Sequence, residues 1–378
     1  MNLRTTFNLT FCKYLIVAFF AFSFSNLFAQ EAEKSGEPES KKFNPGEMIL
    51  EHIGDSHEWH LFGEGEHAVV IPLPIIVYSK ERGLVAFSSA NFHHGQKTYK
   101  GYKLLKNNIV AVDKMDAVDV KDAEKNETVT GDLWDLSITK NVVTLFVSCF
   151  IMLWLFISVA KSYIRNGSNV APKGKQSFIE PLIFFVRDDV AKPSIGEKYE
   201  RYLPYLLTIF FFILINNLLG LIPFFPGGTN LTGNISITMT LAVLTLLIVT
   251  FTANGNYWRH IFAMPGIPIP VLLILTPIEI MGFFLRPLVL MIRLFANITA
   301  GHIIALSFYS LIFIFGEMNV GVCYGVSVLS VSFAIFMGFL ELLVAFLQAY
   351  VFTLLTAMYF GAAVEEHHHE EGHAQHAH

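Results

Sequence analysis

Ionisable side chains lie inside two long apolar runs near the C-terminal end of the chain. They are Glu279, Arg286, Arg293, His302 and Glu341. A charge at the centre of a bilayer costs about 2.5–3.5 kcal/mol on insertion scales, so a structural anchor has no reason to carry one. Histidine and glutamate can exchange protons near neutral pH, whereas arginine keeps its proton. These residue types therefore indicate proton conduction beside a fixed positive charge.

Helical spacing predicts which of these groups share a face. Glu279, Arg286 and Arg293 follow one another at intervals of seven residues, close to two full turns, so they lie on one side of a helix. Asn297, one turn beyond Arg293, joins this side. His302 is half a turn out of phase with Arg293 and roughly 13 Å further along the axis.

The two apolar runs are expected to pair as an antiparallel helical hairpin. A glycine-bounded stretch, 316–325, lies midway between them and supplies the turn. Pairing about its centre puts His302 level with Glu341, and Arg293 level with Gln348. The spacing thus predicts two layers, a titratable His–Glu pair nearer one membrane surface and a permanent positive charge deeper in the membrane.

The elements that carry these groups are membrane spans. The chain is 53% hydrophobic and 15% charged, and all but three of its 26 Lys and Arg residues lie at or before Arg201. An apolar run of about 20 residues crosses the hydrocarbon core. The last two runs are much longer and must tilt, kink or run partly along the membrane. The predicted spans are 141–160, 203–222, 235–253, 269–315 and 326–362.

The N-terminal part of the chain has a different character. Residues 1–29 have a basic start, an apolar core and a small final residue, Ala29, which is typical of a secretory signal peptide. An uncleaved membrane anchor is the alternative. Residues 30–47 are polar, charged and contain two prolines, which predicts a flexible linker.

Residues 48–138 are predicted to form a small β-rich extracytoplasmic domain. Short β-favouring runs, HAVVIPLPIIVYS, GLVAFSS and KNNIVAVDKM, are bounded by Gly, Pro and Lys. The fold class is therefore an all-α polytopic membrane protein, with a long tilted helical hairpin at its C-terminal end and this β-rich domain before it. The transmembrane domain covers 139–362, and a His-rich acidic tail covers 363–378.

Charge distribution predicts the orientation. The connection 161–201 carries eight Lys and Arg, so the positive-inside rule makes it cytoplasmic. Because successive spans cross the membrane in opposite directions, 48–138 then lies outside and the tail inside. An outside location of 48–138 agrees with a signal peptide.

Two groups of residues are compatible with metal binding. One is the His-rich tail 363–378. The other consists of His52, His57, His60, His67, His93 and His94. For both groups, solvated histidines are the preferred interpretation. The cysteines Cys12, Cys149 and Cys323 lie far apart in apolar runs, which argues against a disulfide framework. No cofactor, metal or nucleic-acid site is predicted.

Several segments of the chain resemble subunit a of the F-type ATP synthases. The resemblance covers residues 135–365 in order and is most specific in RLFANITAGH, within 286–305. The other matching segments are ELLVAFLQAYVFTLLTAMYF (341–360), FFVRDDVAKPSIG (184–196) and YLPYLLTIFFFILINNLLGLIP (202–223).

This resemblance implies roles for individual residues. Arg293 matches the essential arginine that faces the carboxylate of the rotating c-ring, with Asn297 and Gln348 beside it. His302 and Glu341 match the pair of the outer half-channel. Glu279 matches a carboxylate of the cytoplasmic half-channel. The implied partners are the c-ring, the b subunits of the peripheral stalk and the other synthase subunits, in a bacterial inner membrane.

Two other functions remain open from the residues alone. An ion-coupled secondary transporter would also carry buried charges, but no repeat relates 141–253 to 269–362. A scaffold without a transport role does not explain Arg293. The chain has no P-loop GxxxxGK[ST], so nucleotide chemistry would belong to partner subunits and the chain would have no active site of its own. The choice between H⁺ and Na⁺ is open.

Overall fold

The computed structural model describes the chain from Ile53 to Val364 with internal gaps, together with residues 45, 46 and 49. The gaps are 63–68, 81, 94, 96, 106, 112–132, 168–170, 223–226, 263, 265–266 and 319. The predicted signal peptide lies outside the described residues, as do nearly all of the predicted linker and tail.

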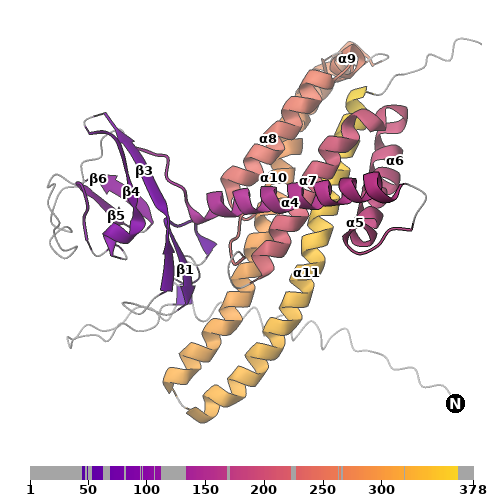
Figure 1. Cartoon of the computed structure of the whole chain (residues 1–378). Helices are drawn as coiled ribbons and strands as arrows, with labels where there is room; N and C mark the ends of the chain where they lie inside the picture. Colours follow the sequence, from indigo (N-terminus) through magenta and orange to yellow (C-terminus); the bar gives the residue numbers. More distant parts are fainter. Residues whose placement is uncertain are drawn as a thin grey trace, which may run out of the picture. The chain divides into compact units, whose positions relative to one another are not determined.

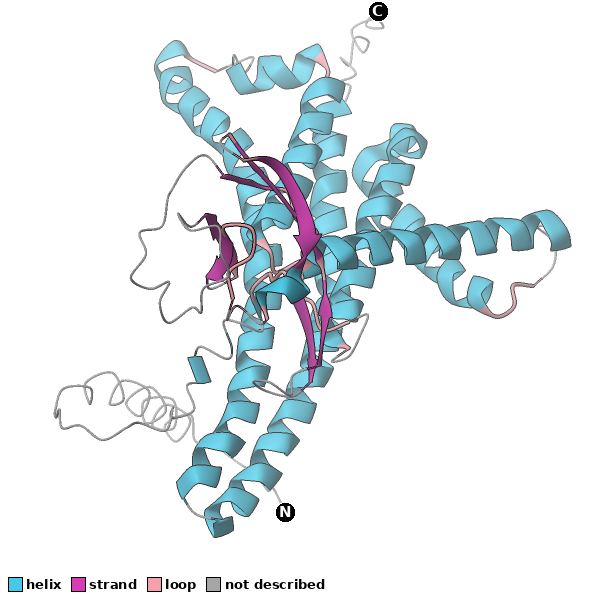
Figure 2. Ribbon diagram, turned by 60° about the vertical axis from the view of Figure 1, so that its left-hand side comes forward, coloured by secondary structure: helices cyan, strands magenta, loops and turns pink. Residues whose placement is uncertain are grey.

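The described N-terminal part is built of short antiparallel strands, whereas the rest of the chain is helical (Figure 2). Strands pair as β1 with β2, as β5 with β6, and as a three-stranded sheet in the order β4-β3-β7. One hydrophobic core serves this strand-rich part of the chain, and it is formed by the side chains of Ile75, Val77, Phe92, Tyr102 and Ile109. The strands are β1 (Glu58–Phe62), β2 (Val69–Pro72), β3 (Pro74–Ser79), β4 (Gly83–Ser88), β5 (Tyr102–Leu105), β6 (Asn108–Ala111) and β7 (Leu133–Asp135).

The three predicted β-favouring runs contain β2, β3, β4 and β6. Strands β1, β5 and β7 were not predicted. Strand β7 has only three residues, with Trp134 and Asp135 exposed, and owes its conformation to pairing with Val77, Tyr78 and Ser79 of β3. Such a strand depends on tertiary contacts rather than on its own pattern.

Five described helical segments are long and apolar enough to cross a membrane, and they match the five predicted spans. The helices are α4 (Lys140–Asn166), α5 (Lys175–Phe184), α6 (Lys192–Ile195), α7 (Tyr199–Leu221), α8 (Ile235–Thr252), α9 (Gly255–Phe262), α10 (Ile269–Met318) and α11 (Val320–Val364). The fold is that of a polytopic membrane protein.

The connection 161–201 is more ordered than its charge suggests. Helix α5, a π-helical turn over Phe185–Ala191 and α6 follow one another before α7. Val186, Val190 and Ala191 are fully buried in the main helical core. Apolar residues between the charges thus tie this segment to the helices.

The last two helices run side by side as an antiparallel pair (Figure 1). Helix α10 has 50 residues and α11 has 45, so α10 is about 75 Å long at 1.5 Å per residue. The hydrocarbon core is about 30 Å thick, and neither helix can stand upright within it. Helix α10 ends at Met318 and α11 begins at Val320, so the reversal falls inside the predicted turn.

Candidate functional site

The helical hairpin brings His302 of α10 and Glu341 of α11 into contact. Nδ1 of His302 lies 2.7 Å from Oε1 of Glu341, and the two side chains are 14% and 12% exposed. A Cβ atom added at Gly301 would lie 2.7 Å from Oε1 of Glu341. Glycine at this position is therefore what allows the carboxylate to lie so close to α10. The predicted pairing of these two levels is present in the structure.

A second polar layer joins the same two helices nearer to Arg293. The side-chain amide Nδ2 of Asn297 donates to Oε1 of Gln348 at 2.9 Å. Gln348 is 3% exposed, and its Nε2 has no partner among the described residues. Gln348 was predicted to lie level with Arg293, and the hydrogen bond that it accepts comes from one turn further along α10.

Arg293 lies on an exposed side of α10. The opposite side is anchored by Leu290, Leu294 and Ile298, which are 1%, 0% and 6% exposed and recur at helical spacing. Arg293 forms no hydrogen bond or ion pair with any residue that the structure describes. Because arginine cannot lose its proton, this position presents a permanent positive charge on the outer face of the hairpin.

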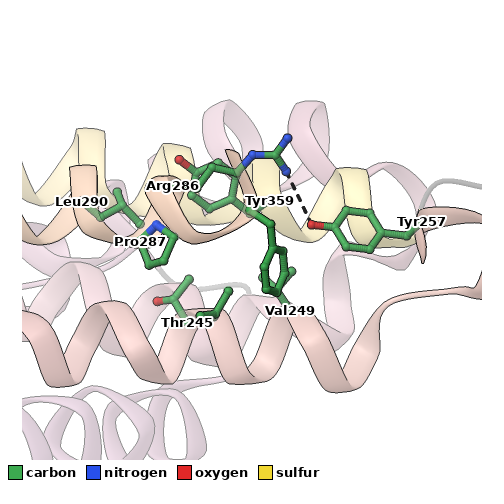
Figure 3. Close-up of a pocket in the computed structure, with 9 residues that line it drawn as sticks. Thr245, Val249, Tyr257, Arg286, Pro287, Leu290 and Tyr359 are labelled. Carbon is green, nitrogen blue, oxygen red and sulfur yellow. Dashed lines mark hydrogen bonds between the residues drawn. The ribbon is translucent and has the colours of Figure 1, made fainter. Parts of the chain in front are cut away.

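The remaining two predicted residues, Glu279 and Arg286, form a separate cluster in the N-terminal half of α10. Figure 3 shows Arg286 with Tyr257 and Tyr359. Nη2 of Arg286 lies 4.0 Å from Oε2 of Glu279, and Nη1 of Arg286 donates a long hydrogen bond of 3.5 Å to the hydroxyl of Tyr257. The guanidinium also lies 5.8 Å from the ring centre of Tyr359 on α11.

This cluster borders a small pocket between α8, α9, α10 and α11. One wall is polar, with Arg286 and Tyr257, and the opposite wall is mostly apolar (Figure 3). Its lining residues are Thr245, Leu246, Val249, Tyr257, Phe283, Arg286, Pro287, Leu290 and Tyr359.

Sequence reasoning did not single out the polar residues that α7 adds to the hairpin. Asn217 is 3% exposed, and its Nδ2 donates to the carbonyl of Ala345 at 3.1 Å. Its Oδ1 accepts from the hydroxyl of Thr232 at 2.6 Å. The signal available in the sequence was the pair Asn216-Asn217 in the middle of an apolar span, where polar groups need partners.

In the described β-rich region, the buried side chain of His57 contacts the exposed Asp135. Nε2 of His57 lies 2.9 Å from Oδ2 of Asp135, and the His57 side chain is 6% exposed. Burial raises the pKa of Asp135, but hydrogen bonds from His57 and Ser137 outweigh it and hold the pKa below its ordinary value. Within the described residues no three His, Cys, Asp or Glu side chains could hold a metal ion. His52, His67 and His94 lie outside those residues.

The fold and the site together define a class, the multi-pass membrane proteins that carry ionisable side chains between their helices. A family model described as ATP synthase A chain matches residues 142–361. A second model, for a domain of unknown function (DUF8433), matches residues 48–135.

Curated relatives bear the same name. An ATP synthase subunit a 2 of Chlorobaculum tepidum is 46% identical over 245 residues, which is 64% of this chain and 67% of the relative. An ATP synthase subunit a of Chloroherpeton thalassium is 43% identical over 247 residues, which is 64% of this chain and 71% of that protein. An ATP synthase subunit a of an Anaeromyxobacter species is 38% identical over 249 residues.

The chain belongs to the ATP synthase A chain family. Its role is in the proton-translocating membrane sector of an ATP synthase, and other subunits of that synthase are its partners. A separate secondary transporter therefore finds no support.

Proposed function

We propose that this chain is the stator subunit that carries protons to and from the rotating c-ring, and that Arg293 faces the acidic residue of that ring. The observation that carries the proposal is the exposed guanidinium of Arg293, which has no acidic partner among the described residues. A permanent charge on a lipid-facing side of a membrane helix is costly. A carboxylate supplied by another subunit would remove that cost.

The two layers of the hairpin support a division of labour. His302 and Glu341, 2.7 Å apart, can pass a proton between them and would form the end of the outer half-channel. Asn297 and Gln348, joined by a 2.9 Å hydrogen bond, are neutral and would hold the adjoining layer in place. Arg293 would favour the ionised rotor carboxylate and prevent a proton from passing straight between the half-channels.

Glu279 is proposed to serve the inner half-channel, at the end of α10 that also carries Arg286. Its carboxylate lies 4.0 Å from the guanidinium of Arg286 and would accept protons from the rotor. The c-ring and the b subunits of the peripheral stalk are the partners that we expect for these surfaces. The chain would bind no nucleotide itself.

We further propose a bacterial inner-membrane location with 48–138 outside and the C-terminus inside. The eight basic residues of 161–201 support this orientation, and a signal peptide over 1–29 would agree with it. The β-rich region would then lie on the side from which protons enter during synthesis.

The decisive test is Arg293→Ala, with Arg259→Ala as the matched control. Arg259 is also exposed, but it lies on the short helix α9. We expect Arg293→Ala to abolish ATP-driven proton pumping and ATP synthesis in inverted membrane vesicles, while Arg259→Ala leaves both near the wild-type level. Coupled pumping at the wild-type rate in Arg293→Ala, with normal amounts of assembled subunit, would overturn the assignment.

A further inference from the structure

The three-stranded sheet β4-β3-β7 is covered on one face by other parts of the β-rich region. Ile75 and Val77 of β3 point to this inner face and are both 0% exposed. They share a hydrophobic core with Phe92, with Tyr102 of β5 and with Ile109 of β6. Because successive side chains of a strand point to opposite faces, the residues between Ile75 and Val77 and beyond them lie on the other side of the sheet.

That other side, which we call the outer face, is exposed and apolar. The register places Tyr78 of β3 directly between Leu84 of β4 and Trp134 of β7. These three side chains are 44%, 67% and 66% exposed. In the next row, the N–H of Leu136 donates to the carbonyl of Ile76 at 2.9 Å, and Leu136 is 58% exposed. The other described members of the outer face are uncharged as well, namely Pro74, Ala86, Ser88 and Ile138.

Such a composition is unusual for the open face of a sheet. An antiparallel sheet with one solvated face normally alternates apolar residues inside with polar residues outside. A contiguous exposed apolar patch marks an interaction site. Tyr78 and Trp134 each combine an apolar ring with a polar group, and these two residue types are enriched where a membrane meets water. The outer face therefore has the composition of a surface that lies in the membrane–water interface.

The outer face is continuous with the start of the membrane span α4. Beyond β7 the chain stays beside β3, and the N–H of Ile138 donates to the carbonyl of Pro74 at 3.1 Å. Helix α4 begins at Lys140, so Ile138 is two residues and Trp134 six residues from the span. At about 3.3 Å per residue, this places Trp134 at most about 20 Å along the chain from α4.

This distance restricts how the sheet can lie. The polar layer on each side of the hydrocarbon core is only about 5–7 Å thick, half the difference between about 40–45 Å and about 30 Å. A strand that stood upright on the membrane would carry Trp134 out of this layer. A strand that runs along the membrane surface would keep Trp134, Leu136 and Ile138 within it.

The β-rich region is held at the first turn of α4, independently of any lipid. The backbone N–H of Lys140 donates to the carbonyl of Ser56 at 3.0 Å, and that of Asn141 donates to Oδ1 of Asp55 at 3.2 Å. The sheet is thus already ordered beside the span. Contact with lipid would cost little additional conformational entropy, which favours even a weak association.

We propose that the outer face of the sheet, formed by Leu84, Tyr78, Trp134 and Leu136, docks on the lipid surface beside α4, with its aromatic rings at the level of the headgroups. The bilayer is the occupant because the face begins at the span itself and offers no charged side chain to a protein partner. The inference requires that α4 crosses the membrane, and it does not rest on the proposed function or on the side of the membrane.

The first test measures what the outer face touches. The synthase is assembled with a chain whose three cysteines are changed to serine, and a nitroxide spin label is attached to Leu84→Cys or Trp134→Cys. The matched control is Leu105→Cys, because Leu105 is a leucine 40% exposed at the end of β5, in the strand pair that covers the inner face. The complex is reconstituted in vesicles of phosphatidylcholine and phosphatidylglycerol. Relaxation of the label is measured with oxygen, which concentrates in lipid, and with a water-soluble nickel chelate.

We expect the labels at positions 84 and 134 to respond more to oxygen and less to the nickel chelate than the label at position 105. An equal response to the nickel chelate at all three positions would overturn the proposal, because the outer face would then lie in water. Labels at 84 and 134 that are immobile and respond to neither reagent would also overturn it, because a protein subunit would then cover the face.

The second test asks whether docking requires an apolar face. Leu84→Glu adds a carboxylate at a side chain that is 67% exposed and outside the core of the sheet, and a charge is costly to bring into the membrane. It should raise the nickel response of a label on Trp134→Cys to that of the Leu105→Cys control, whereas Leu105→Glu should leave this response unchanged. Hydrogen exchange of residues 74–79 checks that the sheet is still folded. If the label on Trp134→Cys responds alike with and without Leu84→Glu in the folded sheet, the outer face is not held by lipid.

Discussion

The contact between His302 and Glu341 allows a quantitative test of the outer half-channel. Both side chains are less than 15% exposed and lie 2.7 Å apart. A hydrogen bond that involves a charged group contributes about 1.5–3 kcal/mol. At about 1.4 kcal/mol for each factor of ten, loss of this contact should slow proton transfer by roughly tenfold to a hundredfold.

Three variants separate the pair from its individual members. His302→Ala and Glu341→Ala each leave one titratable group without its partner in a poorly solvated site, so both should slow ATP-driven pumping in inverted vesicles. The exchange His302→Glu with Glu341→His keeps both groups. It should recover more activity than either single variant, because Gly301 leaves room on α10 for the side chain at 341.

The control is Ser307→Ala, whose hydroxyl bonds only to the carbonyl of Ile303 in its own helix and should not affect pumping. Subunit abundance must be measured beside the rates, because a pair that only permits packing would reduce assembly instead. Should the exchanged variant be no better than the worse single one, the two groups do not act as a unit. Normal pumping in both alanine variants would disprove the half-channel role.

Three further predictions concern Gly301, Asp135 and the N-terminal segment. Gly301→Ala would put a Cβ 2.7 Å from Oε1 of Glu341, so it should slow pumping by about tenfold through displacement of the carboxylate, whereas Gly338→Ala, which meets open space, should not. Because the pKa of Asp135 is lowered from 3.8, its pair with His57 stabilises the β-rich region above that pH and is lost as the pH falls through the lowered pKa. The protection of residues 74–79 against hydrogen exchange in the full chain, corrected for the intrinsic pH dependence of exchange, should therefore fall below about pH 4 in the wild type and change little over the same range in Asp135→Asn; equal profiles would contradict this. N-terminal sequencing of the purified protein should begin at or near Gln30, and an intact Met1 would refute cleavage of a signal peptide.

The hairpin could be predicted from the sequence because a helix has a constant rise and the turn is marked by glycines. Once the turn is placed within 316–325, the level of each residue on α10 fixes its counterpart on α11. His302 and Glu341 meet as this reasoning requires. Gln348, predicted to lie level with Arg293, accepts its hydrogen bond from Asn297, one turn further along α10.

Other parts could not be read from spacing. The helices within 161–201 were missed because their charged residues are interleaved with the buried ones, such as Val186 and Val190. The loop 229–232 between α7 and α8 has the composition of a surface turn, and nothing local shows that it is buried. Its burial is a consequence of how α4, α7 and the hairpin pack, and only tertiary structure brings Thr144 to Thr229.

The charges of α10 differ in how they are satisfied, and this difference bears on the mechanism. Arg286 has Glu279, Tyr257 and Tyr359 around it, so its charge is compensated within the subunit. Arg293, two turns further on, has neither an ion pair nor a hydrogen bond with any described residue. If its role were structural, the simplest arrangement would be a partner like that of Arg286. An uncompensated arginine beside a layer of neutral amides is instead suited to a transient partner, because a permanent internal carboxylate would compete with each carboxylate that the rotor brings past it.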